Sequence, residues 1–262
     1  MTRDGSRAAF VGVNVGVVLL ALWSIVRPLP FGIALVVAVI WVATVLLGVF
    51  VPHLEMFVAV HTEGPPGRRE ISLTFDDGPH PAWTREVLST LERYGARATF
   101  FVIGKKAEAH PELMKEIVAA GHSLGIHSYT HDRFLSLRTV DEVKRDLLRA
   151  QAVLERASGK RCVRFRPPVG HTSPMIARAV SELGLSVVAW TARTMDGLPW
   201  LSDPARRLQR MVKGVRPGAV LLFHDASERT EERPCGLDAL IPVLDAANKA
   251  GLRCVGLDEW EI

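Results

Sequence analysis

Two adjacent aspartates, Asp76 and Asp77, are the residues of this chain whose type and position point most directly to chemistry. They end a short apolar run and precede a Gly-Pro turn. Neighbouring strand side chains point to opposite faces, but such a turn can direct both carboxylates into one cleft. One carboxylate can then bind a metal while the other stays free as a base. The alternative is a pair of solvated turn aspartates, which are common beside Gly-Pro.

His127 and His131 form a second candidate group, in the segment HSYTH. Two histidines four positions apart lie on one face if the chain coils through a helical turn, and imidazole is a common zinc ligand. The segment is not the H-E-x-x-H pattern of metalloproteases, because no glutamate follows the first histidine. The alternative is two surface histidines among the nine of the chain.

Arg166 and His224 follow two further apolar runs and extend the pattern. Arg166 precedes two prolines and a glycine, which form a rigid loop from which a guanidinium can clamp a carboxylate. His224 ends the run LLFH, where an imidazole beside a cleft can act as a general acid. A structural hydrogen bond at the strand end is the alternative role for His224.

The elements that must position these residues alternate between short β-type runs and amphipathic helices, which predicts an α/β domain with a mainly parallel sheet. About seven such units fit a closed or nearly closed barrel, with a doubly wound open sheet as the alternative. No G-x-G-x-x-G follows the first strand, which argues against the nucleotide-binding version of that sheet. Each candidate motif ends a strand, at the edge where active sites of parallel α/β folds lie. We expect strands at 71–75, 98–103, 123–126, 163–165, 185–190, 219–223 and 253–257, and helices at 83–94, 112–120, 140–157, 174–183, 204–213 and 238–250.

Two uncharged apolar runs, at residues 8–26 and 31–51, precede this domain. Each has the length of a membrane-spanning helix, and the Pro-containing turn between them predicts a helical hairpin. A cleaved signal peptide followed by a buried helix is the alternative, disfavoured because a second full-length span follows the first. We therefore expect an anchor over 1–52, a linker over 53–69 and a catalytic domain over 70–262. The prediction is a two-span protein of a bacterial plasma membrane.

The arginines around the two runs give little evidence on topology. Arg3 and Arg7 precede the first span, and only Arg27 lies in the turn. Positively charged loops tend to stay in the cytoplasm, so two arginines against one favour cytoplasmic chain ends only weakly. The side of the membrane that the catalytic domain occupies therefore stays open.

Composition excludes several other classes of protein. The net charge of +4 comes from scattered Lys and Arg residues, so we expect no nucleic-acid partner. Three cysteines without C-x-x-C spacing predict neither a disulfide framework nor a cysteine zinc site.

Four motifs, taken in order, carry a family resemblance. They are TFDDGPH at 74–80, HSYTH at 127–131, RFRPPVG at 164–170 and LLFHD at 221–225. With them, residues 69–262 resemble the polysaccharide deacetylase family, which carries the NodB homology domain and forms carbohydrate esterase family 4. The resemblance implies a distorted (β/α) barrel and a divalent metal, usually zinc, with cobalt or nickel as alternatives.

The resemblance also implies roles for the motif residues. Asp77, His127 and His131 match the family's metal ligands, Asp76 matches its general base, and Arg166 matches the residue that orients that base.

The remaining implied roles lie in the later motifs. His224 matches the general acid, and Asp196 matches a residue that tunes it. A backbone N–H near Val169 would help to hold the oxyanion, and Leu222 would line the pocket for the acetyl methyl. Two residues depart from the family pattern: Val169 replaces a usual tyrosine and Gly197 a usual tryptophan, which predicts a changed substrate groove.

The sequence thus predicts a metal-dependent amidohydrolase that removes N-acetyl groups from an amino-sugar polymer or glycan. One alternative is the same chemistry on another acyl group or a lipid-linked sugar, for example a deformylase, and the two-span anchor motivates it. The other is a catalytically silent carbohydrate-binding membrane protein, motivated by the changes at Val169 and Gly197. The expected partners are an N-acetylated glycan or glycolipid and the lipid bilayer.

Overall fold

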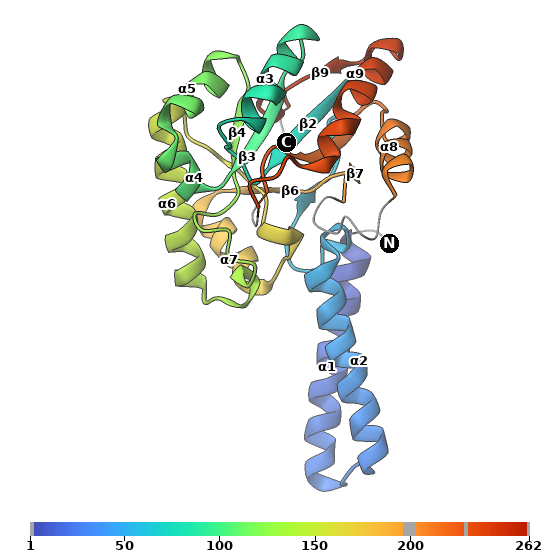
Figure 1. Cartoon of the computed structure of the whole chain (residues 1–262). Coiled ribbons are helices and arrows are strands. Elements are labelled where there is room, and N and C mark those ends of the chain that lie inside the picture. Colours follow the sequence, from blue (N-terminus) through green and yellow to red (C-terminus); the bar gives the residue numbers. More distant parts are fainter. Residues whose placement is uncertain (1–2, 196–202, 228–229, 261–262) are drawn as a thin grey trace.

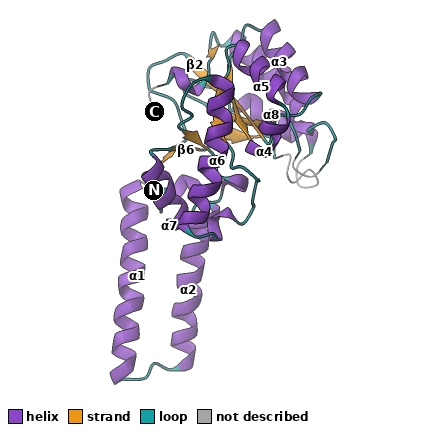
Figure 2. Ribbon diagram, turned by 90° about the vertical axis from the view of Figure 1, so that its left-hand side faces the viewer, coloured by secondary structure: helices purple, strands orange, loops and turns teal. Residues whose placement is uncertain are grey.

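The computed structural model describes residues 3–195, 203–227 and 230–260, and Figure 1 shows them as an α/β domain with two long helices projecting from one end. The helices are α1 (Arg3–Val26) and α2 (Phe31–Phe50). They run side by side, with the connecting turn far from the domain (Figure 2). The start of α1 and the end of α2 therefore both lie on the domain side.

The domain is built on one sheet of parallel strands, in the order β1-β6-β5-β4-β3-β2-β8-β7, with β9 paired to β2. The sheet curls, and residues just after β1 reach the opposite side, where Gly64 N–H donates to the Gly218 carbonyl at 2.8 Å. This curled half-barrel confirms the predicted distorted (β/α) barrel. The strands are β1 (Val60–His61), β2 (Glu70–Asp76), β3 (Ala98–Val102), β4 (Ser123–Ile126), β5 (Arg164–Phe165), β6 (Ser186–Val188), β7 (Ala192–Arg193), β8 (Val220–His224) and β9 (Arg253–Cys254).

Helices cover the outside of the curled sheet (Figure 1), and their ends carry the expected local signals. Thr139 and Glu142 form a reciprocal capping box at the start of α6, while Gly159 ends that helix in the left-handed conformation. The helices are α3 (Trp83–Arg93), α4 (Gly104–Ala109), α5 (Pro111–Ala119), α6 (Val140–Ser158), α7 (Pro174–Leu183), α8 (Pro204–Lys213) and α9 (Leu240–Lys249).

The central strand β2 is buried from Ile71 to Asp76. Phe75 stacks between Phe100 of β3 and Phe223 of β8, with ring centroids 5.0 and 5.5 Å apart. Burial on both faces gives a near-continuous apolar run, as expected for a parallel sheet covered by helices. This packing fixes the end of β2, where the two aspartates lie.

The expected linker at 53–69 is partly strand. Val60 and His61 form β1 and pair with Val187 and Val188 of β6. Two residues are too short to show a period-2 pattern, and their pairing partner lies more than a hundred positions away, so the sequence could not identify them. The short β7 and α4 were missed for the same reason, and the expected strand at 253–257 ends at Cys254.

Both N-terminal helices are long and apolar enough to cross a membrane, over Ala8–Val26 and Phe31–Phe50. The only described contact between their polar side chains is a hydrogen bond from Trp41 Nε1 to Asn14 Oδ1, at 3.1 Å. It satisfies the asparagine of the first run, as interhelical hydrogen bonds do in membranes.

Stability should depend on pH through His122, which is buried at the start of β4 and accepts a hydrogen bond from Ala98 N–H at Nδ1. Burial, and secondarily Arg97, lower the pKa of His122 to about 4. The unfolded chain therefore binds a proton between about pH 6.5 and 4 that the folded chain does not. Stability contributed by the neutral imidazole is full above pH 6.5 and falls as the pH drops towards 4, by about 3 kcal/mol at most.

Thermal unfolding of the full chain in detergent checks this expectation. His122→Gln keeps an acceptor for Ala98 N–H, and we expect it to flatten the loss of stability between pH 6.5 and 4. An unchanged pH dependence in this variant would show that another group carries it.

Candidate active site

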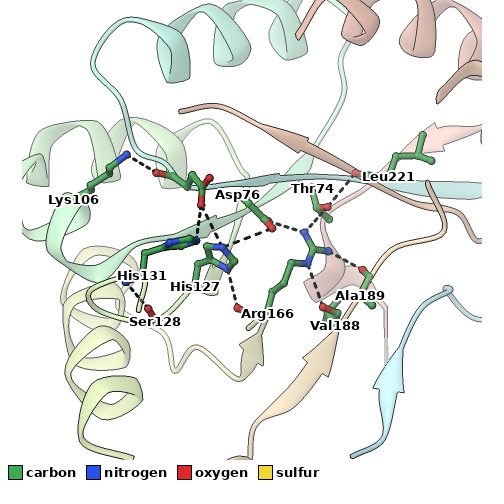
Figure 3. Close-up of polar contacts among 11 residues, drawn as sticks. Thr74, Asp76, Lys106, His127, Ser128, His131, Arg166, Val188, Ala189 and Leu221 are labelled. Atoms are coloured by element: carbon green, nitrogen blue, oxygen red, sulfur yellow. Dashed lines mark hydrogen bonds and ion pairs between the residues drawn. The ribbon is translucent and has the colours of Figure 1, made fainter. Parts of the chain in front are cut away.

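The residues singled out from the sequence meet at the carboxyl ends of neighbouring strands. Asp76 ends β2, His127 follows β4, Arg166 follows β5, and His224 ends β8. Parallel strands place these ends at one edge of the sheet. Figure 3 shows Asp76, His127, His131 and Arg166 turned towards one another.

Asp77, His127 and His131 place one donor atom each within 4.8 Å of one another. Asp77 Oδ1 lies 3.4 Å from His127 Nε2 and 3.2 Å from His131 Nε2. Zinc ligands at about 2.0–2.1 Å in tetrahedral geometry lie roughly 3.3 Å apart, so these separations fit a shared ion. One carboxylate and two imidazoles are also a donor set that zinc prefers.

The tautomer of His127 supports the same interpretation. Its Nδ1 lies 2.8 Å from the Arg166 carbonyl oxygen, which only accepts hydrogen bonds, so Nδ1 carries the proton. Nε2 is then the ring nitrogen that faces the Asp77 carboxylate, at 3.4 Å. Either a proton or a metal ion can bridge these two atoms, and a backbone carbonyl behind a histidine is the usual support for a metal ligand.

Asp77 is held in the ionised form that a metal requires. Burial raises the pKa of this carboxyl, but hydrogen bonds from His127 and His131 outweigh burial and hold the pKa well below its ordinary value. The charge of His224 lowers it further.

The loops that present these side chains adopt strained backbone conformations. Asp77, Ser128, His131 and Val169 all have positive φ, between 54° and 71°, although none is glycine. Such residues cost of order 1–3 kcal/mol each and persist where surrounding contacts fix them. Two such contacts are visible in Figure 3: the Ser128 hydroxyl accepts from His131 N–H, and Lys106 Nζ donates to the Asp77 carbonyl.

Asp76 lies beside this group, with its two carboxylate oxygens in different surroundings. Oδ1 accepts a hydrogen bond from Arg166 Nη1 at 2.7 Å, and Oδ2 faces His127 Nε2 at 4.0 Å. The Arg166 Nη1 also donates to the Thr74 hydroxyl, which in turn donates to the Leu221 carbonyl. One oxygen of Asp76 is therefore fixed by the arginine while the other points to the site.

Arg166 is fully buried and almost completely surrounded. Its Nε and Nη2 donate to the carbonyls of Val188 and Ala189, and the guanidinium carbon lies 4.1 Å from the centre of the Phe101 ring. Burial lowers the pKa of the guanidinium, and the charge of Asp76 opposes that shift. The buried cation and the buried carboxylate balance each other.

The strand register brings His224 and Leu222 to the same face as Asp76. Asp76 pairs with His224 and Thr74 with Leu222, and side chains two positions apart share a face of the sheet. Leu222 is buried, whereas His224 is partly exposed. Both positions are consistent with the side of a cleft.

Two sequence predictions concern the walls of the site. Val169 lies in the loop after β5 with 37% of its surface exposed, so no aromatic side chain closes the site there. Asp196 and Gly197 lie outside the residues that the structure describes.

Sequence reasoning assigned no role to Asp225, although the residue is part of the fourth motif. It is fully buried, and its carboxylate accepts a hydrogen bond from Thr84. Burial raises the pKa of Asp225 to about 7. Gly78 passes so close that an added Cβ would lie 2.4 Å from Asp225 Oδ2, which accounts for the glycine in the Asp-Asp-Gly-Pro turn. In the sequence, the position of Asp225 directly after His224 was the signal that could have identified it as part of the site.

Comparison with known proteins decides the family. Residues 63–188 match the model of the family described as polysaccharide deacetylase. The chain is 30% identical over 208 residues to a peptidoglycan-N-acetylglucosamine deacetylase of Bacillus cereus, covering 79% of this chain and 95% of the relative. The chain belongs to the polysaccharide deacetylase family. The predicted family is thereby confirmed.

Two further relatives support membership of this family. A chitooligosaccharide deacetylase of Azorhizobium caulinodans is 36% identical over 157 residues, which is 59% of this chain and 73% of the relative. A crystal structure of a peptidoglycan N-acetylglucosamine deacetylase in complex with 4-naphthalen-1-yl-N-oxidanyl-benzamide superposes with a TM-score of 0.68 at 28% identity, covering 76% and 91% of the two chains. As a polysaccharide deacetylase, the chain is a hydrolase of carbohydrate esterase family 4.

Proposed function

We propose that this polysaccharide deacetylase is a metal-dependent amidohydrolase that removes N-acetyl groups from amino-sugar glycans. The observation that carries the proposal is the pairing of two unlike carboxylates. Asp77 faces two imidazole nitrogens at ion-binding separations, while its neighbour Asp76 is held by Arg166 with one oxygen directed to the site. A metal ligand beside a separate base is an arrangement that can activate water for the hydrolysis of an unactivated amide.

Asp77, His127 and His131 would hold the metal, with zinc the best match to the donor set and cobalt or nickel as alternatives. When bound, such an ion lowers the pKa of water and polarises the amide carbonyl. Three protein ligands leave a position for solvent or substrate, which separates catalytic from structural zinc sites.

Asp76 would act as the general base. Its Oδ2 would accept the proton from the water that attacks the acetyl carbon, because Oδ1 is already engaged with Arg166. Arg166 would orient Asp76 and keep a negative charge stable in this buried place.

His224 would be the general acid that donates a proton to the leaving amine, since it pairs with Asp76 across neighbouring strands and shares its sheet face. A backbone N–H near Val169 would stabilise the oxyanion, and Leu222 would line the acetyl pocket. Asp196 would tune His224; this assignment comes from the sequence pattern alone.

The N-acetylated substrate is supported by the relatives, which are named as deacetylases of peptidoglycan N-acetylglucosamine and of chitooligosaccharides. The exposed Val169 supports a groove that is more open on the side of the β5 loop.

We also propose that α1 and α2 anchor the enzyme in a membrane as a two-span hairpin. Each helix has an uncharged apolar run of about the length of a bilayer core. The division that follows is an anchor over 1–52 and a catalytic domain over 70–262, with the connection at 53–69 contributing β1 to the sheet.

The test measures metal content and acetate release on the same preparation of the full chain. We expect a stoichiometric divalent metal, and release of acetate from N-acetylated chitooligosaccharides that stops on chelation and returns on adding zinc. Chelator-insensitive turnover would contradict metal dependence. Bound glycan without any acetate release would instead support an inactive carbohydrate-binding protein.

A further inference from the structure

The C-terminal end of α2 docks directly on a loop of the active-site face. Thr172, buried in the loop after β5, donates from its backbone N–H to the Val49 carbonyl at 3.1 Å and from its hydroxyl to the Gly48 carbonyl at 2.9 Å. These are carbonyls of the last helical turn, which lack partners within the helix. The adjacent residues also touch, because the rings of Phe50 and His171 lie 4.6 Å apart.

Further contacts make this junction rigid. His53 lies just beyond α2, and its Nε2 is 2.7 Å from the carbonyl oxygen of Trp190, which follows β6. Gly48 packs against Met56 and Phe57 so closely that an added Cβ would lie 2.4 Å from the Met56 sulfur. The domain is therefore not tethered by a flexible connection, and its orientation towards the hairpin is defined.

The docked loops belong to the carboxyl ends of β5 and β6, the edge that carries the candidate site. Thr172 is six residues from Arg166, so the two lie at most about 20 Å apart along the chain. Figures 1 and 2 agree that the hairpin leaves the domain on the side of α7, the helix that follows this loop.

The length of α2 defines where the bilayer would begin. Its 20 residues rise about 30 Å, which is the thickness of the hydrocarbon core. The core therefore ends close to Phe50. The loop that contains His171 and Thr172 contacts this same end of the helix, so it lies at the level of the membrane surface.

The same edge exposes two large apolar side chains. Phe134 and Leu137 are 66% and 72% exposed, the highest values for large apolar residues in the described part of the chain beyond α2. They follow the ligand His131, and the short helical turn at Leu135–Leu137 packs against α7. Arg133 belongs to the same loop, two positions after His131 and directly before Phe134.

We propose that the mouth of the active site faces the bilayer, that Phe134 and Leu137 contact its surface, and that the substrate is an N-acylated amino sugar carried on a lipid. This inference rests on the proposed function and names its substrate class. Exposed apolar side chains next to an arginine, on the edge of the domain where α2 docks, are suited to an interface with lipid headgroups. A site facing away from the bilayer would instead suit a distant polymer.

Contact with lipid can be measured independently of activity. The full chain carrying Cys235→Ser and Cys254→Ser, with Cys162 buried, is labelled with an environment-sensitive fluorophore at Leu137→Cys or at Ile241→Cys and placed in nanodiscs. Ile241 is the matched control, an exposed apolar residue on α9, away from the hairpin (Figure 1). We expect quenchers attached to lipid to quench the label at position 137 only. Equal quenching at both positions, or none at 137, would overturn the proposed orientation.

Substrate preference is tested with one sugar in two forms. Nanodiscs holding the metal-loaded enzyme receive N-acetylated chitotriose either free in solution or attached to a dioleoyl lipid in the same disc. We expect Phe134→Ser with Leu137→Ser to lower the ratio of lipid-linked to free turnover roughly tenfold, whereas Ile241→Ser leaves the ratio unchanged. Confinement in the disc acts equally on both variants, so it cannot produce this difference.

The outcomes separate the two proposals. Turnover of the free trimer with no preference for the lipid-linked form, and with no effect of the rim substitutions, would overturn the lipid-linked substrate and leave the deacetylase activity intact. Absence of turnover on both forms would overturn the proposed function, while the quenching result would still decide the orientation.

Discussion

Asp76→Asn is expected to lower kcat for acetate release by roughly 10²–10⁴-fold while the protein keeps its metal. The substitution preserves the shape of the side chain but removes its ability to take up a proton, together with the negative charge that pairs with Arg166. Asp76 Oδ2 is 4.0 Å from His127 Nε2, whereas Asp77 Oδ1 is 3.2–3.4 Å from both imidazoles. The structure therefore supports Asp77 as the ligand and Asp76 as the base.

The measurement pairs kcat on N-acetylated chitotriose with metal content for each variant. Asp245→Asn is the matched control, since it makes the same chemical change at an exposed carboxylate bound to Tyr94, and it should leave kcat within about twofold. Loss of metal from Asp76→Asn would show that both aspartates are ligands. Unchanged kcat would remove Asp76 from the mechanism.

The chemistry of the site could be predicted from the sequence because each candidate residue abuts a strand. The apolar runs before Asp76, His127 and His224 indicate strands, and parallel strands bring their carboxyl ends together whatever their separation in the chain. The relation between Asp76 and Arg166 followed from family resemblance, and the structure supplies its geometry, including the Thr74 hydroxyl that supports the arginine.

What could not be predicted depends on tertiary contacts that leave no local pattern. Asp225 looks like any polar residue after a strand. Only the structure shows that Thr84 and Gly78 pack around it and that its burial raises its pKa. The positive φ angles of His131 and Val169 have no signal in residue type, because neither is glycine or asparagine.

The docking of the hairpin on the domain is the clearest example of a feature that could not be predicted from the sequence. The hairpin itself is visible in hydropathy, but hydropathy carries no information on which face of the domain it meets. The contact between Val49 and Thr172 joins segments more than 120 positions apart. It makes the expected linker part of this junction and gives the active-site face a defined direction relative to the helical hairpin.

Arg166→Met should destabilise the protein by about 3–5 kcal/mol, the usual cost of removing one partner of a buried ion pair. The arginine is fully buried, and its loss would leave the Asp76 carboxylate without a counter-charge in the core of the site. The carbonyls of Val188 and Ala189 would also lose their donors. Methionine fills a similar volume, so the effect reports on charge and hydrogen bonding more than on a cavity.

A double-mutant cycle measures the interaction between Arg166 and Asp76 separately from the other contacts of the two side chains. The double variant, Arg166→Met with Asp76→Asn, leaves no buried charge without a partner. We therefore expect its loss in free energy of unfolding to be smaller than the sum of the two single losses, by about 1–3 kcal/mol. Arg164→Met is the matched control on the same strand, because Arg164 is also buried but donates to the Trp260 carbonyl instead of a carboxylate. Its cost should be smaller, about 1–3 kcal/mol.

Unfolding of the full chain in detergent, followed by circular dichroism, measures these differences. Additive effects of the Asp76 and Arg166 substitutions would mean that the two side chains do not stabilise each other, which would remove the reason for a fully buried arginine behind the base. Coupling would instead show that stability and catalysis depend on the same charge pair: the guanidinium that stabilises the fold by pairing with Asp76 Oδ1 also leaves Oδ2 directed to the site.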